Sequence, residues 1–507
     1  MKIGNEVETD RDKIVKEVMN FFEPLFEGRH VSGGAVSDTT FCQDDTLLKY
    51  FLDDLPRLSP QSKVKLEQPI TLEEYELMLE KLPRNKSPGP DGLSYEFYKK
   101  TKDFSAQPMV DVYNSILERH RIAVFMETGA IRLVPKVKGV PAVDQLCPIT
   151  LLNCDYKMLS KILTARLVSV LGEVLVSGQI IGKRKGDINI VCGALNLVQA
   201  VFFAERTKAS FGLFSVDWWK AFDRVFIPYL LQVMRRMGFG RKFRKWIRLL
   251  HSGNKAVFIL DGLSDPINIL FSVRQGDPLA MILYVIFLEP LLQKMTKVIE
   301  GVWVGGARLL HEPYADDISG LFKKGDLQKL DVMITQYEKV SVALVNRDKC
   351  KVMGLGAWRN KSNFEVDLFK VEHSIKILGI WFYPTLAQII RENWRTVIKK
   401  LSDCLMGWRS RVLPTLKLRR LVVEIFGLSK IWYMSQILVL PQWAEEEIES
   451  AVSGFVWTGS HERLDLETLS NPPKSGGVGL LSLRPKVDTL FLATWVRLLS
   501  RPHSSRY

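Results

Sequence analysis

The chain has 507 residues, of which 47% are hydrophobic and 25% are charged, and its formal net charge is +14. This is a globular composition with enough apolar residues for a large core and more than one domain, and it contains no low-complexity tract. The excess of positive charge favours a polyanionic partner, nucleic acid first, although a basic protein with scattered surface charge has the same total.

The cysteines and the apolar runs exclude further classes. None of the six cysteines forms a C-x-x-C pair, so neither a zinc knuckle nor a disulfide framework is predicted, and an intracellular location, nuclear or cytoplasmic, is expected. The longest apolar run, residues 279–292, is interrupted by Glu289 and Pro290 and is shorter than the roughly 20 residues of a membrane span. Residues 1–6 lack the apolar region of a signal peptide, so we expect no membrane partner.

The first hundred residues predict helices and one rigid loop. Apolar positions recur at helical spacing over residues 13–26, and a second helix is expected over 44–52. Thr71 followed by Glu74 predicts a capping box at the start of a further helix. The segment 85–92 contains two prolines and two glycines, which indicate a rigid loop whose default role is that of a connector.

The next segments combine strands, helices and positive charge. Residues 131–136 alternate as an edge strand, because Pro135 fits an edge. A helix is predicted over 155–171, with Lys157 away from its apolar side. A strand pair with cations at its tip suits a triphosphate or a template backbone. The later basic run 183–185 fits either a solvated surface or a nucleic-acid contact.

The centre of the chain predicts alternating helices and strands. Helices are expected over 190–206, 228–237 and 241–250, and Asp261-Gly262 between two apolar runs predicts a hairpin. A short strand over 214–217 ends in Asp217. Tyr314-Ala315-Asp316-Asp317, between two apolar runs, predicts a second tight hairpin with carboxylates at its turn, although an ordinary Asp-rich surface turn has the same pattern.

A meeting of Asp217 with Asp316 would have chemical consequences. Two adjacent carboxylates repel each other and raise each other's pKa, and a hard divalent cation relieves the repulsion. Two Mg²⁺ ions about 4 Å apart would clamp the attacking and leaving oxygens of a phosphoryl transfer. The pair is therefore a hypothesis of nucleotidyl transfer.

Three segments occur in the order seen in reverse transcriptases, and their detailed match resembles those of LINE-type (non-long-terminal-repeat) retrotransposons. They are Val216-Asp217-x-x-Lys220-Ala221-Phe222-Asp223, Arg274-Gln275-Gly276-Asp277-Pro278-Leu279 and Tyr314-Ala315-Asp316-Asp317. The resemblance covers residues 65–385 well and 385–485 loosely. It implies an α+β right-hand polymerase with fingers, an α/β palm of antiparallel sheet plus helices, and a helical thumb.

The resemblance also implies domain limits and site residues. We expect an N-terminal extension over 1–65, fingers and the start of the palm over 66–215, the palm over 216–384, and the thumb with a C-terminal segment over 385–507. It implies a catalytic and metal-binding set of Asp217, Asp316 and Asp317, which would hold two Mg²⁺, with Lys349 as a further catalytic residue. It implies nucleotide contacts from Phe222, Gln275, Gly276 and Lys157, and nucleic-acid contacts from Lys86, Gln179, Arg184, Leu378 and Gly379.

The sequence allows two roles each for Phe222 and Lys349. Phe222 would lie under the sugar and reject a 2′-hydroxyl, or be a core residue, and the two roles are compatible. Lys349, in Asn346-x-x-Lys349, would protonate pyrophosphate or contact the nucleotide, or be an ordinary surface charge.

The expected function is that of an RNA-directed DNA polymerase acting on an RNA template, with dNTPs and a DNA primer or nicked target DNA. The endonuclease domain common in such elements is not expected, so a separate endonuclease would supply the nick. The alternative is a degenerate copy that binds nucleic acid without polymerising. Cys147, where relatives have Arg, and the displaced Arg184 favour that alternative, whereas the intact acids oppose it. A maturase-like intron protein is a third reading.

Overall fold

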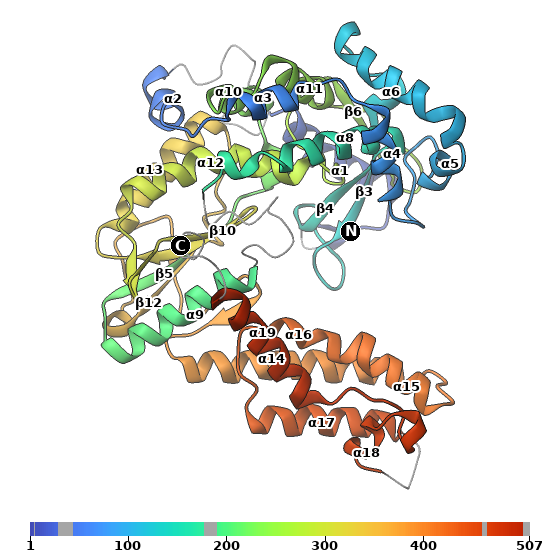
Figure 1. Cartoon of the computed structure of the whole chain (residues 1–507). Coiled ribbons are helices and arrows are strands. Elements are labelled where there is room, and N and C mark those ends of the chain that lie inside the picture. The colour runs from blue at the N-terminus through green and yellow to red at the C-terminus, as the bar shows by residue number, and fades with distance from the viewer. Residues whose placement is uncertain (5, 29–43, 177–189, 459–463, 500–507) are drawn as a thin grey trace.

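The computed structural model describes residues 1–4, 6–28, 44–176, 190–458 and 464–499. Helices and two larger mixed sheets form one part of the molecule, and a group of helices near the C-terminus forms another, as Figure 1 shows. The predicted α+β fold class is confirmed.

A five-stranded sheet with the order β10-β11-β5-β12-β13 carries the predicted acids. Its strands are His311–Tyr314 (β10), Asp317–Phe322 (β11), Phe211–Val216 (β5), Lys351–Leu355 (β12) and Lys370–Val371 (β13). All neighbouring strands are antiparallel except β12 and β13. Alternation along β5 sends Phe214 to one buried cluster and Leu213 to another, so both faces of the sheet are covered.

Different helices cover the two faces. The first cluster contains apolar residues of Ile227–Arg236 (α10), Ala280–Val298 (α12) and Asp326–Ser341 (α13), while the second contains those of Ile190–Thr207 (α9) and of the C-terminal helices. Among the described residues, α9 is the one helix long and apolar enough to span a membrane, and more than half of it is buried in the structure.

A second sheet has the order β4-β3-β6-β7 and corrects one prediction in part. Its strands are Leu146–Leu151 (β4), Thr128–Pro135 (β3), Asn254–Phe258 (β6) and Ile267–Ile269 (β7). The prediction of an edge strand at 131–136 is confirmed for residues 132–135, which pair with β4 alone, but the first half of β3 is central, because residues 128–131 also pair with β6. Pro135 is tolerated because pairing with β6 ends at Ile131, four residues earlier. The hairpin predicted at Asp261-Gly262 is confirmed by the antiparallel pairing of β6 with β7.

The remaining elements of this part are mostly helices. They are Arg11–Phe26 (α1), Asp45–Leu52 (α2), Pro60–Leu66 (α3), Leu72–Glu80 (α4), Tyr95–Lys100 (α5), Lys102–Arg119 (α6), Val124–Glu127 (α7), Cys154–Val168 (α8) and Arg241–His251 (α11), with the short strand pairs Lys2–Ile3 (β1) with Glu6–Val7 (β2) and Val302–Val304 (β8) with Ala307–Leu309 (β9). The predicted capping box of Thr71 and Glu74 is confirmed.

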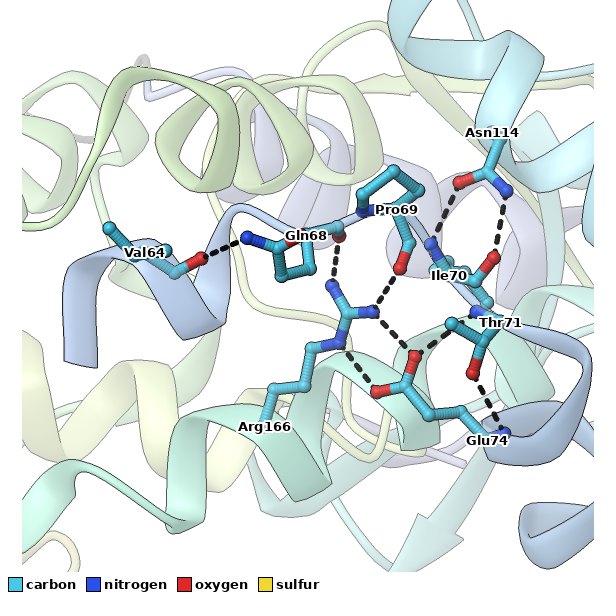
Figure 2. A network of polar contacts seen from close by, with 8 residues as sticks. All are labelled: Val64, Gln68, Pro69, Ile70, Thr71, Glu74, Asn114 and Arg166. Atoms are coloured by element: carbon cyan, nitrogen blue, oxygen red, sulfur yellow. Dashed lines mark hydrogen bonds and ion pairs between the residues drawn. The ribbon is translucent and has the colours of Figure 1, made fainter. Parts of the chain in front are cut away.

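A buried arginine joins α8 to the start of α4, as Figure 2 shows. Arg166 Nε donates to Glu74 Oε1 at 2.8 Å, and its Nη atoms donate to the carbonyls of Gln68 and Pro69 at 2.5 and 2.7 Å. Asn114 of α6 bonds both backbone groups of Ile70 at 2.9 Å. These contacts fix the segment between α3 and α4 against α8.

The C-terminal part follows a small hairpin of Ile375–Ile377 (β14) and Ile380–Phe382 (β15). Its helices are Leu386–Arg409 (α14), Leu416–Val422 (α15), Trp432–Ser435 (α16), Gln442–Val456 (α17), Leu466–Ser470 (α18) and Leu483–Leu499 (α19), and Figure 1 shows α14 to α19 together. Trp394 of α14 is fully buried, and its Nε1 donates to the Val439 carbonyl at 2.8 Å. The same buried cluster includes α9 and one face of the five-stranded sheet, so these helices are anchored to that sheet.

Candidate active site

The hairpin of β10 and β11 places two carboxylates at its turn, as predicted. Tyr314 pairs with Asp317, which leaves Ala315 and Asp316 as the turn residues. Ala315 has a φ of 56°, in the left-handed region that a tight two-residue hairpin turn requires. Asp316 is half-buried and Asp317 is exposed.

The register of the sheet brings the third acid to the same place. Val216 of β5 pairs with Ile318 of β11 in antiparallel register, so the next residues outward, Asp217 and Asp317, lie at adjacent strand ends. The backbone carbonyl of Asp217 accepts a hydrogen bond from Asn346 N at 2.8 Å. Residues separated by about a hundred positions therefore meet through strand pairing.

The same backbone contact places Lys349 beside Asp217. Lys349 N donates to the Asn346 carbonyl at 2.9 Å, which closes a turn, and its Nζ lies 3.7 Å from Asp217 Oδ2. The lysine side chain is largely exposed, so this ion pair contributes little to folding stability. Its position suits a group that approaches the acids from solvent.

The pKa values of two of the acids are raised. Partial burial raises the pKa of Asp316, and the charge of Asp217 raises it further. Although the Asp317 side chain reaches solvent, the surrounding protein atoms reduce its hydration and raise its pKa to about 6, and the charges of Asp316 and Asp217 raise it further. Mutual repulsion of this kind is relieved by a cation.

The donor set fits a hard divalent ion because it consists of carboxylate oxygens. Within the described part of the chain, no group of three or more His, Cys, Asp or Glu side chains is arranged to hold an ion by itself. Ions at Asp217, Asp316 and Asp317 would therefore complete their coordination with water or with phosphate oxygens, which is how Mg²⁺ usually binds.

Phe222 lies in a single helical turn, Ala221–Arg224, that follows β5 and is hydrogen-bonded to the segment before α12. Its backbone carbonyl accepts from Val273 N at 3.0 Å, which joins the segment after β5 to the segment before α12. The ring is half-buried and lies on Tyr284 of α12 with a centroid distance of 4.9 Å. Phe222 thus has both a packed face and solvent access, as the two interpretations of the sequence allowed.

Gln275 and Gly276 sit against β4. Thr150 N donates to the Gln275 carbonyl at 2.7 Å. Gly276 has a φ of 118°, and a Cβ there would lie 2.4 Å from the Thr150 carbonyl oxygen, so only glycine fits. The Cys147 thiol donates to Gln275 Oε1 at 3.0 Å, so the thiol present in place of the expected Arg contacts the predicted nucleotide residue.

Sequence reasoning missed several members of this region. Gln275 Nε2 lies 3.4 Å from both carboxylate oxygens of Asp223, and burial raises the pKa of Asp223 to about 7. Lys220 donates to the carbonyls of Asp144 and Leu146 at 2.9 and 3.0 Å. Asp223 and Lys220 belong to the motif that begins at Val216, so the sequence alone could have identified them as candidate site residues.

Tyr284 could not have been found from the sequence in the same way. It lies within a continuous apolar run, where a tyrosine carries no sign of a neighbouring site. The structure places its ring under Phe222, a contact between residues far apart in the chain.

Two other predicted residues, Lys157 and Lys86, are associated with the loop 85–92. Lys157 Nζ donates to the Ser87 carbonyl at 3.3 Å and lies over the Tyr95 ring at 5.2 Å, so it supports the loop 85–92. Lys86 in that loop is exposed, and the loop approaches α8 so closely that a Cβ at Gly89 would lie 2.2 Å from Asn153 Oδ1.

Leu378 and Gly379 form the turn between β14 and β15. Their φ values are 49° and 83°, and the hydroxyl of Tyr433 donates to the Leu378 carbonyl at 2.6 Å. The Leu378 side chain is buried, so this turn presents backbone rather than the leucine side chain. Gln179 and Arg184 lie outside the residues that the structure describes.

Comparisons with known proteins agree with the geometry. Residues 134–382 match the family described as reverse transcriptase (RNA-dependent DNA polymerase). The chain is 28% identical over 504 residues to the transposon TX1 uncharacterized 149 kDa protein of Xenopus laevis, a match that covers 97% of this chain and 37% of the relative.

Two further relatives are named as products of mobile elements. The RNA-directed DNA polymerase from mobile element jockey of Drosophila funebris is 25% identical over 425 residues, with 77% of this chain and 44% of the relative covered. The retrovirus-related Pol polyprotein from type-2 retrotransposable element R2DM of Drosophila melanogaster is 24% identical over 440 residues, with 81% and 39% covered. The chain therefore spans less than half the length of each of these relatives.

The matched range includes Asp217, Asp316 and Asp317 together with the strands that bring them to one point. The order of the three motifs, the antiparallel sheet under the acids and the named relatives lead to one family. Residues 134–382 form a reverse transcriptase domain, and the chain is similar to proteins named for the mobile elements TX1, jockey and R2.

Proposed function

We propose that the chain is an RNA-directed DNA polymerase that extends a primer on an RNA template by two-metal nucleotidyl transfer. The single observation that supports this most is the convergence of Asp217, Asp316 and Asp317 at adjacent strand ends. The primer 3′-hydroxyl attacks the α-phosphorus of a dNTP, a phosphodiester bond forms, and pyrophosphate leaves.

Asp217 and Asp316 would hold two Mg²⁺, with Asp317 assisting. Reverse transcriptases generally use divalent metal ions, which activate the attacking hydroxyl and stabilise charge on the transferred phosphate when bound. The protein's own contribution is position: strand pairing fixes the acids, and Lys349, 3.7 Å from Asp217, offers a proton or a charge to the departing pyrophosphate.

Nucleotide selection falls to the segment around Phe222. Its half-buried ring, supported from behind by Tyr284, suits a group that lies under the sugar and rejects a 2′-hydroxyl. Gln275 and Gly276 would lie by the template and nucleotide, since Gly276 allows close backbone approach. Lys157 supports the 85–92 loop, and we propose that any effect it has on the nucleotide passes through that loop.

The proposed partners are an RNA template, a DNA primer or nicked target DNA, and dNTPs. Lys86 is exposed and free to meet template phosphate, and the Leu378-Gly379 turn would hold the primer end by its backbone. Gln179 and Arg184 remain predicted contacts. We further propose that a separate endonuclease supplies the nick, that the protein works inside the cell, and that fingers, palm and thumb divide near residues 215 and 385.

Primer extension on an RNA template with Mg²⁺ tests the proposal, comparing the wild type with Asp316→Asn. Asp261→Asn is the matched control, because Asp261 is an exposed residue at another hairpin turn with a left-handed φ of 54°. We expect Asp316→Asn to lose about a hundredfold or more in extension rate, and the control to match the wild type. Equal extension by Asp316→Asn would reject the metal assignment. Template binding by the wild type without extension would favour the degenerate copy.

A further inference from the structure

Tyr284 lies on the second turn of α12, and the role that we assign to it below rests on the proposed function. Its side chain is 1% exposed, and within the described residues its hydroxyl has no hydrogen-bond partner. A buried hydroxyl without a partner is costly, so such a group in a folded protein calls for an explanation.

The surroundings of Tyr284 suggest that explanation. Its ring lies under Phe222, with 4.9 Å between ring centroids and 33° between ring planes. Burial raises its pKa well above the ordinary value, and the charges of Asp316, Asp217 and Asp317, in that order, raise it further. The hydroxyl therefore stays protonated within electrostatic reach of the acid cluster, with a proton to donate and carboxylates as the nearby acceptors.

We propose that Tyr284 is a positioning residue with two separable parts. Its hydroxyl donates to Asp316 when the acids hold metal, which fixes the direction of that carboxylate. Its ring holds Phe222 in place under the sugar. The two parts act on different steps, metal binding and sugar selection, so different substitutions separate them.

The choice of Asp316 as acceptor follows from the fold. Asp316 stands in the β10–β11 turn, and Tyr284 packs in the same buried cluster as Ile318 and Val216, which lie next to the acids on β11 and β5. A hydrogen bond from a neutral donor to a carboxylate is stronger than one between neutral groups, and it restricts the rotamer of the acid.

Tyr284→Phe tests the hydroxyl, because it keeps the ring. The matched control is Tyr75→Phe: Tyr75 on α4 is also fully buried, and its hydroxyl also lacks a partner among the described residues. Since each change removes an unpaired hydroxyl, neither variant should melt at a lower temperature than the wild type. A functional loss in Tyr284→Phe alone then cannot come from misfolding.

The first readout is Mn²⁺ binding to the protein alone, followed by the electron paramagnetic resonance signal of the free ion. We expect the dissociation constant to rise about tenfold in Tyr284→Phe, to stay unchanged in Tyr75→Phe, and to rise most in Asp316→Asn. Unchanged Mn²⁺ binding in Tyr284→Phe would overturn the hydroxyl's role. Failure of the wild type to bind Mn²⁺ would overturn it as well, because no ion-holding carboxylate would then need orientation.

The second readout is single-nucleotide incorporation from dNTPs and rNTPs. Tyr284→Phe should lower kcat and keep the sugar preference, while Tyr284→Leu, which removes the ring, should lower that preference about tenfold. An unchanged preference in a folded Tyr284→Leu protein would overturn the ring's role. No incorporation by the wild type would refute the proposed polymerase function instead, and the Mn²⁺ titration would still decide the role of the hydroxyl.

Discussion

Glu312 is a buried acid on the strand that carries the active-site hairpin, and its burial predicts a pH-dependent loss of stability. Its Oε1 accepts a hydrogen bond from Asn196 Nδ2 of α9 at 2.8 Å, and its Oε2 faces Gly193, where a Cβ would lie 3.2 Å away. Burial raises the pKa of Glu312 from its ordinary value of 4.5 to about 7, and the bond from Asn196 offsets only part of this shift. The carboxyl is thus held protonated well above its normal range.

The sign and the magnitude follow from proton linkage. Between pH 4.5 and 7 the folded chain holds a proton on Glu312 that the unfolded chain has released, so stability falls as pH rises through this window. With pKa values of 4.5 and about 7, the loss is about 1 kcal/mol at pH 5 and about 3 kcal/mol at pH 8. Glu312→Gln keeps the acceptor for Asn196 and removes the titration.

Urea unfolding at pH 5 and pH 8 measures the effect. The stability of Glu312→Gln relative to the wild type should increase by about 2 to 3 kcal/mol between the two pH values, because the wild type loses stability and the variant does not. Glu118→Gln, an exposed glutamate of α6, is the control and should follow the wild type. A constant difference between Glu312→Gln and the wild type at both pH values would refute the reasoning.

Three further predictions concern the nucleotide site and the packing behind it. Phe222→Ala should lower the preference for dNTP over rNTP about tenfold or more in single-nucleotide incorporation, and an unchanged preference would remove Phe222 from sugar selection. Gly276→Ala should destabilise the protein by about 1–3 kcal/mol in thermal unfolding and raise the KM for dNTP. The cause is that the new Cβ would lie 2.4 Å from the Thr150 carbonyl oxygen, at a backbone φ that alanine rarely adopts. Wild-type stability and KM would show that the segment of Gly276 moves away from β4 at little cost. Arg166→Met should lower the free energy of unfolding in urea by about 3–5 kcal/mol, because the Glu74 carboxylate and the carbonyls of Gln68 and Pro69 lose the guanidinium donor. Arg236→Met, which breaks an exposed ion pair with Asp53, should lower it by less than about 1 kcal/mol. Similar losses in the two variants would show that the burial of Arg166 is unimportant.

Local patterns in the sequence were enough for much of the fold. The capping box at Thr71, the hairpin at Asp261-Gly262 and the carboxylates at the turn after Tyr314 depend on residues a few positions apart, and each is confirmed. The meeting of Asp217 with the Asp316 turn could be expected from the resemblance alone, because no short-range pattern records which strands pair.

The features that sequence reasoning missed depend on contacts between distant segments. The central position of the first half of β3 was not predictable from Pro135, since the proline lies beyond the residues that pair with β6. No local pattern in the sequence indicates that Lys157 bonds to the Ser87 carbonyl or that Arg166 bonds to the segment before α4. Such roles are set by which helices pack together, a property of the whole chain.

The most direct test of the shared metal site is anomalous diffraction from crystals grown with Mn²⁺ and a dNTP. We predict two manganese peaks at the ends of β5 and β11, one of them in contact with carboxylate oxygens of both Asp217 and Asp316. Ordered dNTP with no manganese between these two side chains, or with each acid turned toward bulk solvent, would contradict the proposal that they act together.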